Sequence, residues 1–297
     1  MKKELLTRFM EKRIVELKKE QRNGTAHVYQ STLNRLKNFM NGREITFSQL
    51  TPEWLALFEQ KLLADQLKWN TISTYMRMLR SVYNQALERG VATYVPRLFN
   101  KVHTGIDCPV KRAVSPEVIC RLMTDRKPLP GKLAFSRDLF VLLFLLRGMP
   151  FVDLAFLRRC DLQGNVITYH RRKTSRKLTV VVGKEAMEII QNPGKDEYGQ
   201  YARMLRLQNY RLTQVANILG IRDRLSTYTA RHTWATTALR QNYNSSLICD
   251  AMGHSSVKVT ETYFQPYRDD EVNRMNSSLI TYILSKKKRG TDKKIRS

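Results

Sequence analysis

The sequence predicts a mostly α-helical protein with one small antiparallel β-hairpin, divided into two domains. Apolar residues recur at helical spacing through residues 1–97 and again after residue 115. Residues 165–182 instead show β-branched alternation around a polar tip, which is typical of a hairpin. Pro96, Gly105 and Pro109 break the pattern, and over residues 98–114 we expect a linker between the two domains.

The charge balance indicates the class of partner. The chain has 297 residues, and its 52 lysines and arginines exceed its 26 aspartates and glutamates, which gives a net charge of +26. A hydrophobic content of 42% is sufficient for packed cores. An excess of one sign on this scale favours a polyanionic partner, and nucleic acid is the leading candidate.

Several other classes of protein are not indicated. The longest apolar run, residues 139–146, has eight residues, whereas a membrane-spanning helix needs roughly 20. Met1 is followed by charged residues rather than by an apolar export signal, so we expect a cytoplasmic protein associated with the nucleoid. The four cysteines are scattered, which predicts reduced, buried thiols and neither a disulfide framework nor a zinc site. We expect no metal and no cofactor.

The first domain, residues 1–97, is predicted to be helical throughout. Thr51 and Pro52 are typical of a helix N-cap and first helical position, and Gly90 is typical of a helix end. The helix expected from about residue 71 to residue 89, together with the turn before it, carries basic side chains that could follow a phosphate backbone. A solvated helix face is an equally good interpretation. The expected DNA contacts of this domain are Lys68, Arg77 and Arg80.

The linker is itself basic, and we expect Lys111 and Arg112 to contact DNA phosphates. A helix-start pattern opens the second domain, residues 115–285. Residues 139–146 are apolar on every side and predict a buried helix. Residues 286–297 are expected to be a solvated basic tail, because seven of these twelve residues are lysine or arginine.

The most informative stretch lies towards the C-terminus. Residues 229–236 read Thr-Ala-Arg-His-Thr-Trp-Ala-Thr, residues 252–256 read Met-Gly-His-Ser-Ser, and Tyr263 follows His254 by nine residues. This arrangement resembles the tyrosine recombinase (integrase) family. The resemblance covers nearly the whole chain and implies a helical core-binding domain, a basic linker, and a catalytic domain with a lysine on a β-hairpin.

The resemblance implies a role for each of these residues in metal-free cleavage of a DNA phosphodiester. Such cleavage needs a nucleophile, cations on the non-bridging oxygens and an acid for the departing 5′-oxygen. Tyr263 would be the nucleophile that forms a 3′-phosphotyrosyl link, which keeps the bond energy for religation without ATP. Arg231 would clamp the phosphate with its planar guanidinium. His254 would donate to the same phosphate or hold the surroundings of the nucleophile in place.

Lys173 lies at the hairpin tip, where the family carries a mobile general-acid lysine that protonates the leaving oxygen. Lys177 is the competing candidate for this role. Arg171 and Arg172 precede Lys173 and are expected to be simple phosphate contacts.

Two positions depart from the family pattern. Tyr228 stands where most members have a histidine, and a phenol with an ordinary pKa near 10 is a poor base at pH 7, although it can still hydrogen-bond a phosphate oxygen. Pro150 stands where the family has its first arginine. Arg147 is the nearest substitute, because a helical turn would place it on the same face as Pro150, and a helix C-terminal charge is the alternative role. Asp153 corresponds to the family's acidic residue and is expected to orient the arginines.

We therefore expect a site-specific DNA recombinase that exchanges strands through a Holliday junction, in integration, excision or inversion. The expected partners are double-stranded DNA, three further copies in a tetramer on DNA, and accessory DNA-bending proteins. An apolar stripe within residues 272–283 suits the C-terminal helix that joins subunits in the family. One alternative is a type IB topoisomerase, which shares the chemistry. The other is a recombinase-like DNA-binding protein that has lost catalysis; Pro150 and Tyr228 are in its favour, whereas the presence of Lys173, Arg231, His254 and Tyr263 together argues against it.

Overall fold

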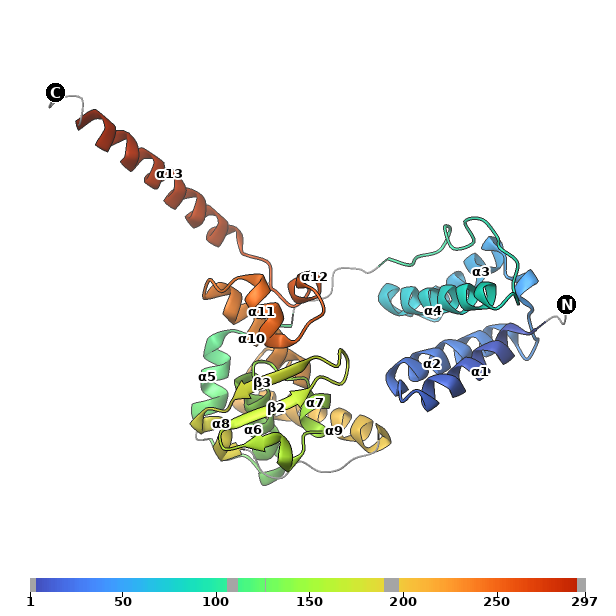
Figure 1. Cartoon of the computed structure of the whole chain (residues 1–297), viewed down its shortest axis with the longest axis horizontal. Coiled ribbons are helices and arrows are strands. Elements are labelled where there is room, and N and C mark those ends of the chain that lie inside the picture. The colour runs from blue at the N-terminus through green and yellow to red at the C-terminus, as the bar shows by residue number, and fades with distance from the viewer. Residues whose placement is uncertain (1–3, 106–111, 126, 190–197, 293–297) are drawn as a thin grey trace. The chain divides into compact units, whose positions relative to one another are not determined.

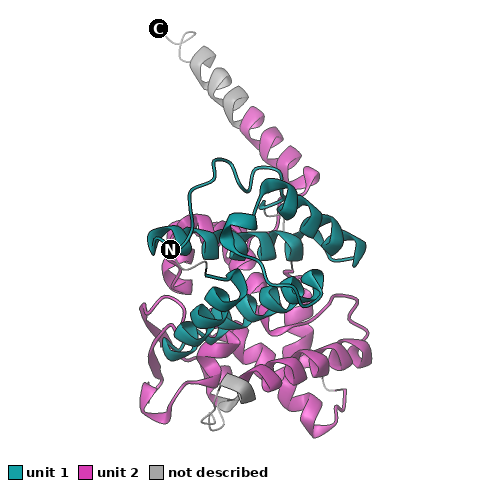
Figure 2. Cartoon of the chain, turned by 90° about the vertical axis from the view of Figure 1, so that its right-hand side faces the viewer, with its two compact units in different colours: residues 1–109 teal, residues 110–297 magenta. Residues whose placement is uncertain are grey.

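A computed structural model describes residues 4–105, 112–125, 127–189 and 198–292 of the chain. The chain divides into two compact units, Met1–Pro109 and Val110–Ser297 (Figure 2), and each is described by itself. The predicted fold class is confirmed, because the described residues are mainly helical and include one small antiparallel sheet.

Unit 1 is a set of helices around one apolar core (Figure 1). Thr51 caps the third α-helix, because its hydroxyl oxygen accepts the N–H of Trp54 at 3.1 Å. Gly90 has a left-handed backbone (φ +66°) just after the fourth, which is the usual way for glycine to end a helix. The elements are α1 (Leu6–Lys19), α2 (Asn23–Met40), η1 (Phe47–Gln49), α3 (Pro52–Ala64) and α4 (Trp69–Glu88).

The linker expected over residues 98–114 is shorter than the sequence suggested. Leu98, Phe99 and Val102 are buried in the core of unit 1, so the first unit continues beyond residue 97. At the other end, the N–H of Val114 donates to Oγ1 of Thr233 at 3.0 Å, which attaches this segment to unit 2. Apolar side chains within the expected linker explain the difference, because burying them stabilises each unit.

Unit 2 packs helices against a three-stranded antiparallel sheet in the order β1-β2-β3. The register pairs Val166 with Val181 and His170 with Lys177, as expected for a hairpin. Its elements are α5 (Pro116–Thr124), α6 (Gly131–Leu145), α7 (Phe151–Ala155), η2 (Arg159–Asp161), β1 (Leu162–Gln163), β2 (Val166–His170), β3 (Lys177–Val181), α8 (Lys184–Ile189), α9 (Tyr198–Leu219), α10 (Thr227–Arg240), α11 (Ser245–Met252), α12 (Val257–Glu261) and α13 (Asp269–Asp292).

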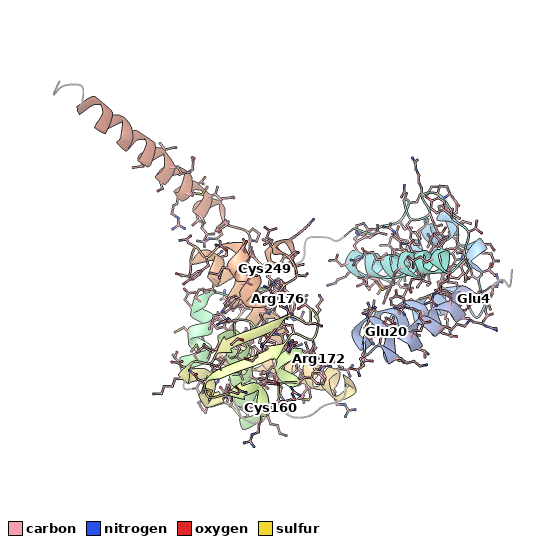
Figure 3. The ribbon with its side chains drawn as sticks, in the orientation of Figure 1. Glu4, Glu20, Cys160, Arg172, Arg176 and Cys249 are labelled. Atoms are coloured by element: carbon pink, nitrogen blue, oxygen red, sulfur yellow. The ribbon has the colours of Figure 1, made fainter. Side chains whose placement is uncertain are left out.

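The core of unit 2 is built on α6, the buried helix that the apolar run predicts. Its residues 140–143 are all buried, and α9 and α10 pack against it. The expected basic tail is partly helical, because α13 continues to Asp292. Of the cysteines that the structure describes, Cys249 is buried as expected, whereas Cys120 and Cys160 are exposed. Figure 3 labels Cys160 at the bottom of the view and Cys249 well above it. Within the described ranges, no helix is long and apolar enough to cross a membrane.

Candidate active site

The β2–β3 hairpin docks on the turn that ends α11, and Gly253 makes this close approach possible. Gly253 has a left-handed backbone (φ +65°), and a Cβ atom there would lie 2.6 Å from Cδ of Arg171. Arg176 adds two contacts, from Nη1 to the carbonyl oxygen of His254 at 3.1 Å and from Nη2 to Oδ1 of Asp250 at 2.9 Å. The hairpin that carries Lys173 and the turn that carries His254 are therefore held together.

Arg171 is buried at this junction, which corrects the expectation that it is a simple surface contact with DNA. Its Nη1 donates to the carbonyl oxygens of Met252 and Gly253, at 3.0 Å each, and its Nε donates to Oδ2 of Asp153 at 3.3 Å. Asp153, on α7, is 3% exposed, and its Oδ1 also accepts the backbone N–H of Arg172 at 3.0 Å. Asp153 thus orients an arginine as predicted, and that arginine is Arg171.

Arg231, on α10, is the most enclosed charged side chain of the site and is only 2% exposed. Its Nη1 donates to the carbonyl oxygen of Gly148 at 2.5 Å, and its Nη2 lies 2.8 Å from both the carbonyl oxygen of Met252 and Nε2 of His254. Its Nε is buried and has no acceptor among the described residues. Burial, and then the charge of nearby Arg171, lowers the pKa of Arg231. A buried donor without an acceptor is costly, so this nitrogen is available to a ligand.

His254 is held in one tautomer by its two neighbours. The guanidinium of Arg231 can only donate, so Nε2 of His254 accepts and its Nδ1 carries the proton. Nδ1 lies 2.9 Å from Oγ1 of Thr260, which accepts this proton and can itself donate to a backbone carbonyl. Burial, followed by the charge of Arg231, lowers the pKa of His254 to about 3. The imidazole is therefore neutral at physiological pH.

Tyr263, which follows α12, packs its ring in the centre of this group. Its ring stacks on that of His254 with centroids 4.9 Å apart, and Cζ of Arg231 lies 5.4 Å from the centroid. Its carbonyl oxygen accepts from Nδ1 of His232 at 3.0 Å and from Oγ1 of Thr236 at 3.2 Å, both on α10. Ring and backbone are thus both fixed against α10.

Tyr228 lies directly beside the candidate nucleophile. Its hydroxyl oxygen is 2.7 Å from that of Tyr263, a distance typical of a short hydrogen bond between hydroxyls. Arg112, expected to be a linker contact with DNA, is exposed, and its Cζ lies 6.0 Å from the centroid of the Tyr228 ring. Lys111 lies outside the described residues.

Lys173 and Arg172 lie in the turn between β2 and β3 and are both exposed. The positive charge of Lys173 repels a proton on His254 and so contributes to the lowered pKa of that histidine. Arg172, labelled in Figure 3, has Cζ 3.9 Å from the ring centroid of Phe156. Lys177, the competing candidate, pairs with His170 at the end of β3.

Arg147 does not continue the helical turn that would have placed it on one face with Pro150. Arg147 (φ +59°) and Gly148 (φ +66°) both have left-handed backbones after the end of α6, which makes the helical spacing argument wrong. The half-buried Arg147 side chain instead extends to β3, where Nη1 donates to the carbonyl oxygen of Thr179 at 3.3 Å. Its peptide nevertheless adjoins the site, because the carbonyl oxygen of Gly148 is bonded to Arg231.

The basic residues expected to bind DNA in unit 1 differ in their exposure and in their hydrogen bonds within the protein. Lys68 is exposed at the start of α4. Arg77 is half-buried, and its Nε donates back to the carbonyl oxygen of Ser73 at 3.3 Å. Arg80 is also half-buried, with Nη2 3.1 Å from Oγ1 of Thr104. All three belong to one helix and its N-cap.

The burial of Arg171 could have been found in the sequence. Ile167, Tyr169 and Arg171 follow one another at the spacing of two that keeps side chains on one face of a strand, and all three are buried. Arg171 therefore belongs to the inner face and Arg172 to the outer face. Thr260 was within the C-terminal motif but was given no role, because its contact with His254 depends on how the turn after α11 folds.

The site concentrates positive charge away from water. The buried ionised side chains of unit 2, among the residues described, are Arg171, Arg231 and the single carboxylate Asp153. Buried charges need partners, so the surplus favours an anionic ligand. The described part of the chain contains no group of three or more histidine, cysteine, aspartate or glutamate residues that could hold a metal ion.

Comparisons with known proteins agree with this arrangement. The phage integrase SAM-like domain matches residues 5–102, and the phage integrase family matches residues 113–269. A comparison with curated proteins finds no match.

Three solved structures illustrate the similarity of fold. The integrase of the Tn1549 transposon, in complex with transposon right-end DNA, is similar with a TM-score of 0.69 and 13% identity, over 93% of this chain and 100% of that chain. A lambda integrase dimer bound to a COC′ core site has a TM-score of 0.64 and 12% identity, over 88% of this chain and 77% of that chain. A lambda integrase tetramer bound to a Holliday junction has a TM-score of 0.64 and 13% identity, over 90% of this chain and 80% of that chain. Because one family model matches more than half of the chain and the fold agrees with it, the chain belongs to the phage integrase family of tyrosine recombinases.

Proposed function

We propose that this protein is a site-specific DNA recombinase that cleaves and exchanges strands through a 3′-phosphotyrosyl intermediate on Tyr263. The observation that carries the proposal is the phenol of Tyr263 packed against Arg231 and His254, next to a buried surplus of positive charge. A buried cationic site with an unpaired donor suits a phosphate, and a tyrosine beside it can attack that phosphate.

The proposed step forms one bond and breaks one. The hydroxyl oxygen of Tyr263 bonds to phosphorus, and the bond from phosphorus to the 5′-oxygen breaks. Lys173 gives its proton to that leaving oxygen, and its exposed position in the hairpin turn leaves it free to move with the DNA. Arg231 stabilises the charge on the non-bridging oxygens, and its Nε is the donor that has no acceptor among the described residues. Neutral His254 holds Arg231 in place rather than transferring a proton.

The charge that the family places at the position of Pro150 has two candidate sources. Nη1 of Arg171 and Nη2 of Arg231 lie 3.0 Å and 2.8 Å from the same carbonyl oxygen of Met252, so the two nitrogens are at most 5.8 Å apart, the sum of these distances. We propose that Arg171 supplies the second positive charge of the site. Arg147, whose side chain reaches the carbonyl oxygen of Thr179 on β3, is then a peripheral phosphate contact.

The partners follow from the family and from the surface. Related structures hold DNA, and one is a tetramer on a Holliday junction. We propose double-stranded DNA as the substrate, with contacts from Lys68, Arg77, Arg80, Lys111, Arg112 and Arg172. In α13, Val272, Met275, Leu279 and Ile280 are exposed, and we propose that they join neighbouring copies into a tetramer. Integration, excision and inversion share this chemistry, and a cytoplasmic, nucleoid-associated location and accessory DNA-bending proteins fit all three.

A covalent trapping experiment tests the proposal. The probe is a library of nicked duplexes with a randomised centre. Cleavage of such a duplex releases a short DNA strand, so religation fails and the protein stays covalently attached to the DNA. We expect an adduct in EDTA, none with Tyr263→Phe, and an unchanged adduct with Tyr267→Phe, which removes an exposed phenol four residues further on. Adducts that persist in Tyr263→Phe would overturn the proposal.

The same protein and duplexes distinguish the two alternatives, a type IB topoisomerase and a DNA-binding protein without catalysis. Junctions formed between two selected duplexes indicate a recombinase, whereas relaxation of supercoils without junctions indicates a type IB topoisomerase. Selective binding without any adduct would indicate a recombinase-like DNA-binding protein, the candidate that Pro150 and Tyr228 favour.

A further inference from the structure

The proposed reaction requires the proton of Tyr263 to leave, and the structure indicates where it goes. Tyr263 is 9% exposed, so the residue as a whole has little contact with water. A phenol attacks phosphorus far better once its proton is removed. The inference below rests on the proposed function, because it concerns the same nucleophile.

Two histidines touch the Tyr263 ring, and the hydrogen bonds described for them go to groups other than its hydroxyl. Nε2 of His254 accepts a hydrogen bond from Arg231, and its Nδ1 already carries a proton, which donates a hydrogen bond to Oγ1 of Thr260. With its pKa near 3, His254 takes up no proton at neutral pH. Nδ1 of His232 is directed to the carbonyl oxygen of Tyr263 and therefore not to its hydroxyl.

Arg231 also hydrogen-bonds the side chain of Tyr263, but a guanidinium can only donate. The hydroxyl oxygen of Tyr228 lies 2.7 Å from that of Tyr263 and can accept its proton. Tyr228 is also 44% exposed, so the pair connects a largely buried tyrosine to the surface. We propose that Tyr228 relays the proton of Tyr263 to solvent. Its hydroxyl oxygen accepts the proton from Tyr263 while its own proton passes to a water molecule, and the electron pair left on the Tyr263 oxygen forms the bond to phosphorus.

A relay suits a phenol better than the role of a base. The pKa of Tyr228 is raised by burial and by its hydrogen bond to Tyr263, so Tyr228 does not exist as a phenolate waiting to take a proton. A relay needs only a hydroxyl that accepts on one side and donates on the other, and tyrosine has both functions. Tyr228 thus ends each transfer as a neutral phenol.

The charged groups around Tyr228 favour this transfer. Arg231 and His232 face it from α10, Tyr263 faces it from the segment after α12, and Arg112 faces it from the segment that enters unit 2. Of these, Arg231 and Arg112 are cations, and both act to lower the pKa of Tyr228. A transient negative charge on either phenol is therefore stabilised.

Arg112 is held beside Tyr228 by the residues that follow it. The carbonyl oxygen of Ala113 accepts from Nε2 of Gln265 at 2.7 Å, and the N–H of Val114 donates to Thr233 at 3.0 Å. These bonds attach the segment to α10 and to the chain two residues beyond the nucleophile. Arg112 is exposed and forms no ion pair among those described for the chain, so its charge is available to the phenols.

The test is the single-turnover rate of adduct formation on the selected nicked duplex, measured from pH 6 to pH 9. We expect Tyr228→Phe to be slower by about 10² at pH 7, within the range for lost proton transfer. Its rate should rise about tenfold per pH unit, because hydroxide must then take the proton, whereas the native profile is flatter. Tyr228→His should recover rate at pH 7, since an imidazole with a pKa near 6.5 can accept the proton. Tyr243→Phe, an exposed phenol just beyond α10, is the matched control and should behave as the native protein.

Arg112→Ala provides a second test that leaves both phenols in place. We expect about a tenfold slower rate with unchanged thermal stability, and partial recovery in Arg112→Lys. A native rate and native pH profile in Tyr228→Phe would overturn the relay, as would a loss that Tyr228→His does not recover in a folded protein. The proposed function fails separately, if the native protein forms no adduct or if Tyr263→Phe forms one.

Discussion

Arg171 and Asp153 allow the catalytic and structural contributions of one buried charge to be separated. Arg171→Met would remove the guanidinium and leave the carboxylate of Asp153, which is 3% exposed, with the N–H of Arg172 as its remaining partner among the described residues. Leaving one member of a buried ion pair alone typically costs about 3–5 kcal/mol. We therefore expect Arg171→Met to lower the free energy of unfolding of unit 2 by about that amount. If Arg171 is the second cation, the cleavage rate also falls by about 10²–10³.

The double variant Arg171→Met with Asp153→Asn separates the two effects. It removes both charges, so no uncompensated ion is left, and the amide can still accept the N–H of Arg172. We expect most of the lost stability to return while the cleavage rate stays low. Unfolding in urea gives the stability of each variant, and single-turnover adduct formation gives its rate.

Arg147→Ala is the matched arginine variant. Its lost contact is a partly exposed 3.3 Å hydrogen bond to a carbonyl, so stability should change by no more than about 1 kcal/mol. A double variant at Arg171 and Asp153 that is stable and cleaves at the native rate would refute the reasoning. A loss of 10² or more in Arg147→Ala alone would instead identify Arg147 as the second cation.

Three further outcomes follow from the structure. Gly253→Ala should destabilise unit 2 by about 2–4 kcal/mol, because its Cβ atom would lie 2.6 Å from Arg171 on a left-handed backbone. Thermal unfolding measures this loss, and the control is Gly164→Ala, whose Cβ atom would have no neighbour within 4 Å. His254 has a pKa of about 3 when folded and an ordinary 6.5 when unfolded, so the unfolded state binds more protons between these values and stability falls as pH drops from 6.5 towards 3. His254→Gln should flatten that acid limb, and a limb equally steep in the variant would contradict the assignment. DNA affinity should fall steeply with salt, with a slope of about −5 or steeper in log K against log salt for half a dozen phosphate contacts. A nearly flat dependence would exclude a role for the net charge in DNA binding.

The sequence predicted those parts of the fold that depend on local pattern. The alternation over residues 165–182 gave the hairpin and its turn, because each strand needs one apolar face. The helices followed from apolar spacing in the same way. Arg147 was placed wrongly because a helix was extended past its end, although Gly148 is the kind of residue that allows a left-handed turn there.

The remainder of the site depends on contacts between distant residues. Tyr228 and Tyr263 are 35 residues apart, and no spacing in the sequence indicates that their hydroxyls meet at 2.7 Å. Arg171 and Arg231 share the carbonyl of Met252 only after the hairpin and the turn after α11 pack together. Such contacts are decided by tertiary packing, and local propensity does not predict them.

The identity of the residue that becomes linked to DNA, and of the DNA end that it carries, tests the central proposal most directly. Native protein trapped on the nicked duplex in EDTA would be digested, and the nucleotide-bearing peptide sequenced by mass spectrometry. The account predicts one modified residue, Tyr263, carrying a phosphate linked to the 3′ end of the cleaved strand, with a free 5′-hydroxyl on the other fragment. A link to any other residue, a 5′-phosphate linkage, or cleavage that requires a divalent metal would contradict it.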